Sequence, residues 1–353
     1  MEDKYNAICL LFTLHDIISY SMYDWIDPDI EIKNVVYFIS KFIELGGITG
    51  YGIKELIFSQ YTYYFRGVSK YLLKYYDEFG MNPEKIKKYI FKYYNYVKKD
   101  AKDKIVRNYH SSFMSQIDEG STSKYTRVNE LLNPSYKSLL FCVPLGLKFW
   151  SEDDLDKLIE SSFILAKLVD DNMHVLLGGF VSSLFITLGL RDISIYKWIK
   201  IMLDILESDK IKKYIDNDEK QKDYLMFLRY WNIYYDTRFV NDKPIIAFAT
   251  TDLLYRNKFF DDNFRDKKYG YFGETSYFSL ILHYDALISC SGVWERFLYY
   301  STIHHGWHAS AYAGALFGSV YKFNGVFKNL INDIEQHNKI DELSKKMFKS
   351  FSK

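Results

Sequence analysis

The residues NMHVLLGGFVSSLFITLGL, at positions 172–190, form a run without a single Asp, Glu, Lys or Arg. Its length approaches that of a membrane-spanning helix. The run also contains paired glycines at 178–179, paired serines at 182–183 and Thr187, and we interpret it as a buried core helix of a large helical protein. A second uncharged run, 297–321, contains three histidines, which a bilayer would penalise. We interpret it in the same way, so no membrane association is expected.

Helical periodicity dominates the chain on both sides of this run. An amphipathic helix is predicted over the first twenty residues, where the i, i+3, i+4, i+7 spacing is kept by Ala7, Leu10, Leu11, Leu14, Ile17 and Ile18. The segment 35–45 repeats the pattern and ends at Gly46-Gly47, a predicted C-cap. Further helices are predicted over 84–98, with Pro83 just inside the start, and over 155–168, with aspartates in the first turn.

Signals for other structure are scarce. Only 244–250 could be extended, and the polar segments 118–125 and 256–271 are predicted to be long loops. No linker composition or internal repeat is present, and the charged segment 333–353 is predicted to be a surface helix. These patterns predict an all-α fold in a single compact multi-helix domain.

Composition excludes several classes of protein. The 353 residues contain 46 Lys+Arg and 45 Asp+Glu, a net charge of +1, so no basic field for nucleic acid is expected. The cysteines Cys9, Cys142 and Cys290 are scattered in apolar runs, which excludes a disulfide scaffold and predicts buried structural thiols. The N-terminus lacks the basic flank of a signal peptide, and we expect a cytoplasmic protein.

Candidate chemistry is sparse. His304 and His308 are four residues apart, so on a helix they would share a face that could chelate a metal, or they could be part of a satisfied histidine cluster. Asp170-Asp171 could bind a cation or simply begin the next helix, where acids favour the helix dipole. No nucleophile motif such as Gly-x-Ser-x-Gly occurs.

A set of motifs in conserved order resembles the ADP-ribosylglycohydrolases, and is most similar to the branch that removes ADP-ribose from arginine. His15-Asp16-Ile17-Ile18-Ser19 resembles the family's Gly-Asp-Ala-Leu-Gly. The other matching segments are Leu45-Gly46-Gly47-Ile48, Pro144 to Phe149, Leu177-Gly178-Gly179, Tyr284-Asp285-Ala286-Leu287 and Ala313 to Gly318. The resemblance covers residues 1–335 as one all-α domain, and leaves 336–353 as a C-terminal helical tail.

The resemblance implies a central cleft that holds two magnesium ions in active members. The family's Ser-Asp-Asp-Thr corresponds to Ser59-Gln60-Tyr61-Thr62, where both acids are missing. The second metal motif, His-Gly-Gly-Asp-Ser-Asp-Ser-Thr, corresponds to a stretch that includes His305, Trp307 and His308. No Asp or Glu occurs between 296 and 332, so the magnesium pair is expected to be lost and no cofactor is expected.

The resemblance also points to degenerate substrate positions, namely Asp16, Ser135, Lys137, Phe141 and Asp170. The family's glycines near the substrate are replaced here by larger side chains. Because Tyr61, Trp307 and Phe141 are bulky, we predict that they converge on the former cleft and partly fill it.

We therefore expect a catalytically inactive member of this fold that binds protein partners or serves a structural role in an intracellular assembly. Residual ADP-ribose binding would be weak. The alternative is an ADP-ribosylarginine hydrolase or ADP-ribose-binding protein with a rebuilt, non-magnesium site. Such a site would use a transition metal at His304, His305 and His308, with Asp170 or Asp171 as a further ligand.

Overall fold

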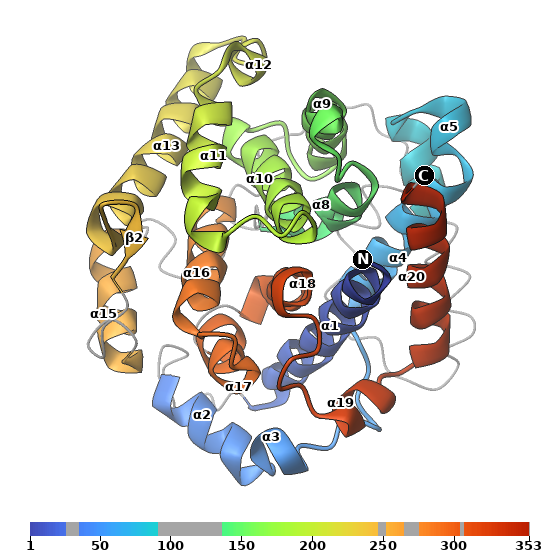
Figure 1. Ribbon diagram of the computed structural model, residues 1–353, viewed down its shortest axis with the longest axis vertical. Coiled ribbons are helices and arrows are strands. Elements are labelled where there is room, and N and C mark those ends of the chain that lie inside the picture. The colour runs from blue at the N-terminus through green and yellow to red at the C-terminus, as the bar shows by residue number, and fades with distance from the viewer. Residues whose placement is uncertain (26–34, 91–135, 246–251, 265–274, 304–306, 353) are drawn as a thin grey trace.

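A computed structural model describes residues 1–25, 35–90, 136–245, 252–264, 275–303 and 307–352 (Figure 1). Most of the described residues are helical, which confirms the all-α prediction. Within the described residues the strands are β1 (Phe239–Val240) and β2 (Lys243–Pro244), which pair antiparallel. The α-helices are α1 (Glu2–Ser21), α2 (Val35–Glu44), α3 (Gly47–Gly50), α4 (Gln60–Lys74), α5 (Tyr76–Phe79), α8 (Lys137–Lys148), α9 (Leu155–Ala166), α10 (Met173–Leu190), α11 (Trp198–Leu206), α12 (Asp209–Lys212), α13 (Asp218–Arg238), α15 (Leu253–Phe264), α16 (Ser276–Ser289), α17 (Trp294–Leu298), α18 (Ser310–Tyr321), α19 (Lys328–Asn332) and α20 (His337–Phe351).

The uncharged run at 172–190 forms α10, a central helix that contacts α8, α9, α13, α16 and α18. Within the described chain it is the one helix long and apolar enough to cross a membrane, yet 94% of it is buried inside the protein. Its glycines permit close packing, since a Cβ on Gly178 would lie 2.4 Å from the Ser276 Cβ. Because α10 is apolar on every side, it is buried on every side as a core helix.

The first helix is more deeply buried than its periodicity predicts. Only one apolar face was expected for α1, but most of its residues are buried, including Thr13, His15 and Asp16. The cause is α18, which lies along α1 at very short range (Figure 1). A Cβ on Gly314 would lie 2.1 Å from the Leu11 carbonyl oxygen, so only glycine allows this approach.

Several predicted boundaries are confirmed. The α2 helix ends at Glu44 and Gly46 follows with φ +110°, a conformation that favours glycine. Residues 83–90 are helical with Pro83 in the first turn, and the side chain of Asn82 accepts a hydrogen bond from the Lys85 N–H. The tail helix α20 packs against α1 and α4. Its buried residues include Ile340, Leu343 and Met347.

Two predictions are wrong. The segment predicted as a loop over 256–271 begins inside α15, because Arg256, Phe259, Phe260 and Phe264 form one buried face. Charged and polar residues lie between these buried positions, so the helical spacing of the apolar residues was not recognised in the sequence. The run 297–321 is not one continuous helix, since α17 leads into a π-helical turn, η4 (Tyr299–Ile303), and a 3₁₀ turn, η5 (Trp307–Ala309), precedes α18. Of the run 244–250, only 244–245 lies in the described residues, and the segment 118–125 lies outside them.

The cysteine prediction is confirmed. Cys9, Cys142 and Cys290 are free and buried. Burial raises the pKa of the Cys9 and Cys142 thiols far above the usual range, and that of Cys290 to about 11. All three are therefore neutral packing groups at physiological pH.

Candidate functional site

The carboxylate of Asp16 is the centre of the candidate site. It lies on α1, is 2% exposed, and meets the start of α4. Its Oδ1 accepts a hydrogen bond from Ser59 Oγ at 2.6 Å. Its Oδ2 accepts three more, from Ser59 N at 3.0 Å, Thr62 N at 3.2 Å and Thr62 Oγ1 at 2.7 Å. Asp16 therefore holds the segment 59–62 in place by its first and last residues.

These four hydrogen bonds decide the chemistry open to Asp16. Burial raises its pKa to about 6, while the hydroxyl and backbone donors of Ser59 and Thr62 act in the opposite direction. The group is still ionised at pH 7. An ionised carboxylate offers about four acceptor positions, two on each oxygen. Oδ2 is fully used by its three donors, whereas Oδ1 accepts one bond and keeps one lone pair. Asp16 is thus committed to capping α4, whose N-terminal end favours a negative charge.

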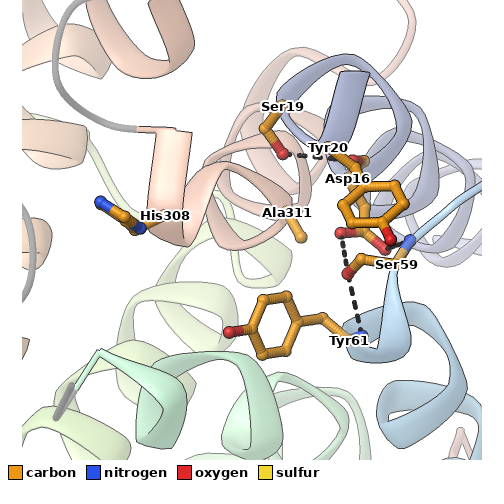
Figure 2. Close-up of a pocket in the computed structure, with 7 residues that line it drawn as sticks. All are labelled: Asp16, Ser19, Tyr20, Ser59, Tyr61, His308 and Ala311. Carbon is orange, nitrogen blue, oxygen red and sulfur yellow. Dashed lines mark hydrogen bonds between the residues drawn. The ribbon is translucent and has the colours of Figure 1, made fainter. Parts of the chain in front are cut away.

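A small pocket opens beside Asp16. The residues that line it are Asp16, Ser19, Tyr20, Ser59, Tyr61, His308 and Ala311 (Figure 2). The pocket has a cavity volume of about 20 Å³. A single water needs about 10–15 Å³ by the same measure, so the pocket suits one or two waters rather than a nucleotide.

Three of the predicted site segments meet at this pocket through aromatic rings. Tyr61 comes from the first turn of α4, and its ring crosses the pocket from the side of Ser59 (Figure 2). Its hydroxyl is 2.8 Å from the hydroxyl of Tyr136, which directly precedes α8. The Tyr136 ring lies 5.5 Å from the His308 ring, which comes from η5. We call Tyr61, Tyr136 and His308 the aromatic bridge.

Burial keeps the Tyr61 phenol of the aromatic bridge neutral. Burial raises the pKa of the Tyr61 phenol to about 12, more than its hydrogen bond to Tyr136 lowers it. A neutral phenol is a weak ligand for a hard cation. Tyr61 therefore supplies ring volume and a hydroxyl bridge rather than negative charge.

The other predicted site residues that the structure describes at Gln60, Lys137, Phe141 and Asp170 do not line this pocket. Gln60 is buried, and its Oε1 accepts a hydrogen bond from Tyr64 OH at 3.4 Å. Phe141 does not line the pocket, because its ring stacks on Tyr64 at 5.0 Å. Lys137 begins α8, where burial lowers the pKa of its amine to about 8. Asp170 is also outside the lining and accepts a hydrogen bond from Asn172 N at the start of α10.

Part of the predicted site lies outside the described residues. This applies to Ser135, His304 and His305, and to the side chain of Trp307. Of the three side chains predicted to fill the cleft, Tyr61 lies at the pocket and Phe141 packs behind it in the core. His308 lies in the turn η5, and the helical face predicted to be shared by His304 and His308 is not tested, because His304 lies outside the described residues.

Sequence analysis missed four residues of this region, namely Ser19, Tyr20, Tyr136 and Ala311. Three of them had a detectable signal. Ser19 ends the motif His15 to Ser19, and Tyr136 lies between the two predicted substrate positions Ser135 and Lys137. Tyr20 directly follows that first motif, whereas no motif marked Ala311.

The donor set does not fit a pair of magnesium ions. Magnesium requires near-octahedral oxygen coordination, and two ions need several carboxylates to offset their charge. Among the described residues that line the pocket, Asp16 is the one acid, and most of its acceptor positions are already used. Across the described ranges, no group of three or more His, Cys, Asp or Glu side chains is placed to hold a metal.

Comparison with known proteins identifies the scaffold. No family model matches the sequence. A solved structure titled ADP-ribosylglycohydrolase-related protein complex matches over 99% of this chain and 98% of its own, with a TM-score of 0.61 and 11% identity. At that identity the match establishes the fold alone. The protein is thus an all-α domain with the fold of the ADP-ribosylglycohydrolases.

Two relatives match by sequence. ADP-ribosylhydrolase ARH1 of Dictyostelium discoideum is 28% identical over 228 residues, which cover 58% of this chain and 57% of the relative. A protein of Acanthamoeba polyphaga mimivirus, named as an ADP-ribosyl glycohydrolase, L444, is 24% identical over 325 residues, covering 86% and 61%. The chain spans about three fifths of the length of these relatives. Its sequence is similar to these two relatives, and its fold is that of the ADP-ribosylglycohydrolases.

Proposed function

We propose that this protein is a catalytically inactive member of the ADP-ribosylglycohydrolase family. In this proposal it acts through protein partners, in a binding or structural role, in the cytoplasm. It uses no cofactor, and any binding of ADP-ribose is weak. The observation that carries the proposal is the aromatic bridge beside the carboxylate of Asp16, which accepts four hydrogen bonds from Ser59 and Thr62.

The chemical argument concerns what hydrolysis of a glycosidic bond to arginine would need. A metal-dependent enzyme needs an activated water and an electrophile for the ribose hydroxyls. At this pocket the first metal segment presents a neutral amide and a neutral phenol, from Gln60 and Tyr61. The second has no carboxylate at any position between 296 and 332. Neither segment can therefore supply the negative charge that such a site requires.

Space supports the same proposal. A pocket for a small-molecule ligand typically has a volume of roughly 300–1,000 Å³. The cavity volume of the pocket beside Asp16 is about 20 Å³, far smaller than that. Because the Tyr61 ring lines this space and its hydroxyl is hydrogen-bonded to that of Tyr136, enlarging the pocket at Tyr61 requires breaking this hydrogen bond and moving the ring. We therefore expect that the surface of the helical fold, rather than the pocket beside Asp16, supports the function.

The test combines an activity assay with a binding measurement. Purified protein is incubated with magnesium and an ADP-ribosylated arginine substrate, and its melting midpoint is measured with and without magnesium and with ADP-ribose. We expect no hydrolysis and no saturable shift. A real site would be visible, because a ligand at a hundredfold excess over Kd stabilises a fold by about 2.7 kcal/mol. Magnesium-dependent turnover would overturn the proposal.

Restoring the acids gives a sharper test. The triple variant Gln60→Asp, Tyr61→Asp, Trp307→Asp returns carboxylates to the two metal segments. We expect it to be less stable than the parent and still inactive. The matched control is Gln60→Asn, Tyr61→Phe, Trp307→Phe, which changes the same positions without adding charge. Robust hydrolysis by the acidic variant alone would show that only the ligands are missing and that the site is otherwise intact.

A further inference from the structure

A second cluster of buried charge lies far along the chain from Asp16, where α13, α15 and α16 meet. Asp285 of α16 is 1% exposed. Its Oδ1 accepts hydrogen bonds from Tyr234 OH at 2.8 Å and from Arg238 Nε at 2.9 Å. Its Oδ2 is in close contact with Nη1 of Arg256, which is also 1% exposed. One carboxylate thus serves two guanidinium groups.

The two arginines are not equally well satisfied. Arg238 places its remaining donors on Ser289 Oγ at 3.3 Å and on the Ile245 carbonyl oxygen at 3.5 Å. Arg256 has no such partners, and its Nε and Nη2 are buried without a hydrogen-bond acceptor in the described structure. Buried polar groups almost always have a partner, which is protein, water or an ion.

The walls around Arg256 are aromatic. Its guanidinium carbon lies 4.4 Å from the centre of the Tyr300 ring and 5.4 Å from that of Phe260. Ring faces attract a cation, but they do not accept the in-plane N–H groups as an anion does. Burial, and next the charge of Arg238, lower the pKa of Arg256 to about 9. Arg256 is still charged at neutral pH.

The charge balance of the cluster is therefore uneven. Among the described residues, two buried guanidinium groups face a single buried carboxylate, which leaves one positive charge beside the rings of Phe260 and Tyr300. An uncompensated charge in such a place strongly disfavours the folded state. A monovalent anion would neutralise it, and the enclosed position favours a small anion over a bulky one.

We propose that the cluster of Arg238, Arg256 and Asp285 is a binding site for one small monovalent inorganic anion of the chloride class, held by the Nε and Nη2 groups of Arg256. The anion completes the contacts of Arg256 and joins α15 to α13 and α16. The site is separate from the pocket beside Asp16, so the inference does not depend on the proposed function.

The test compares salts at equal ionic strength. Melting midpoints are measured in sodium chloride, sodium bromide and sodium gluconate. We expect a saturable rise of about 2–5 °C in chloride and bromide and none in gluconate. Arg256→Met should abolish the difference between salts. Arg229→Met, on the exposed side of α13, is the matched control and should retain it.

A structural measurement covers the case in which Arg256→Met does not fold. Crystals of the unmodified protein grown in bromide should show an anomalous peak in contact with Arg256. A midpoint that follows ionic strength alone, whatever the anion, would overturn the proposal. Bromide peaks confined to the surface, with none beside Arg256, would overturn it as well.

Discussion

Asp16 and Thr62, from different helices, are joined by two hydrogen bonds to the same oxygen. The Oδ2 of Asp16 accepts from the Thr62 N–H at 3.2 Å and from Thr62 Oγ1 at 2.7 Å. Together with the two bonds from Ser59, this fixes the first turn of α4 against α1. The buried carboxylate of Asp16 thus joins two helices that are distant in the sequence.

Replacing Asp16 by Asn is therefore expected to destabilise the protein. The amide nitrogen would face donors instead of accepting from them, and the negative charge at the start of α4 would be lost. Hydrogen bonds to charged groups contribute about 1.5–3 kcal/mol each, and we expect a total loss of roughly 3–5 kcal/mol. Urea unfolding measures it. Glu2→Gln, an exposed change on the same helix, is the control, and an equal loss there would contradict the prediction.

Acid should destabilise the protein through His15. The indole N–H of Trp294 donates to His15 Nε2 at 3.1 Å, which only a neutral ring can accept. Burial, and next the nearby His283, lower the pKa of His15 from 6.5 to about 3. Between these two values the unfolded chain binds more protons, so this contribution to the free energy of unfolding is complete above about pH 6.5 and is lost as the pH falls toward 3.

The measurement for His15 is a difference between proteins. His15→Gln keeps a donor and an acceptor but cannot be protonated. Relative to this variant, the parent should lose stability below pH 6.5, by about 1.4 kcal/mol for each pH unit. Asp16 has the opposite slope between about pH 4 and 6 because its pKa is raised, but it is present in both proteins. A pH-independent difference would refute the prediction.

Close packing of α18 on α1 depends on Gly314. A Cβ there would lie 2.1 Å from the Leu11 carbonyl oxygen, and backbone cannot move aside as a flexible side chain can. Gly314→Ala should destabilise by about 1–3 kcal/mol, the usual range for overpacking. Gly52→Ala is the control, because a Cβ at Gly52 meets nothing within 4 Å. Thermal unfolding of both variants is sufficient to check this.

The bridge between Tyr61 and Tyr136 should show measurable coupling. Tyr61→Phe removes one hydroxyl of a 2.8 Å pair and should lower the free energy of unfolding by about 0.5–1.5 kcal/mol. Tyr136→Phe and the double variant complete a double-mutant cycle, in which the second change should have less effect than the first. Tyr196→Phe, at a 40% exposed residue, should have almost no effect. Strictly additive losses would show that the pair is not coupled.

The pattern of residues predicted the architecture more accurately than it predicted the site. The run at 172–190 and the first twenty residues were identified as helices, because an apolar pattern reports burial directly. The helix α15 was predicted to be a loop, because its buried positions include Arg256, whose charge gives no sign of burial in the sequence. A charged residue becomes a core residue only when a distant partner, here Asp285, is brought to it.

For the candidate site, the sequence by itself determined that Gln60 and Tyr61, the positions that its resemblance predicts for metal ligands, carry no acid. It also determined that Asp16 is present. Only the tertiary structure decided what Asp16 does and that Tyr61 meets Tyr136. These contacts join residues 43 and 75 positions apart, and local periodicity carries no information on pairs so distant. They arise when α4 and α8 pack around the buried helices α1 and α10.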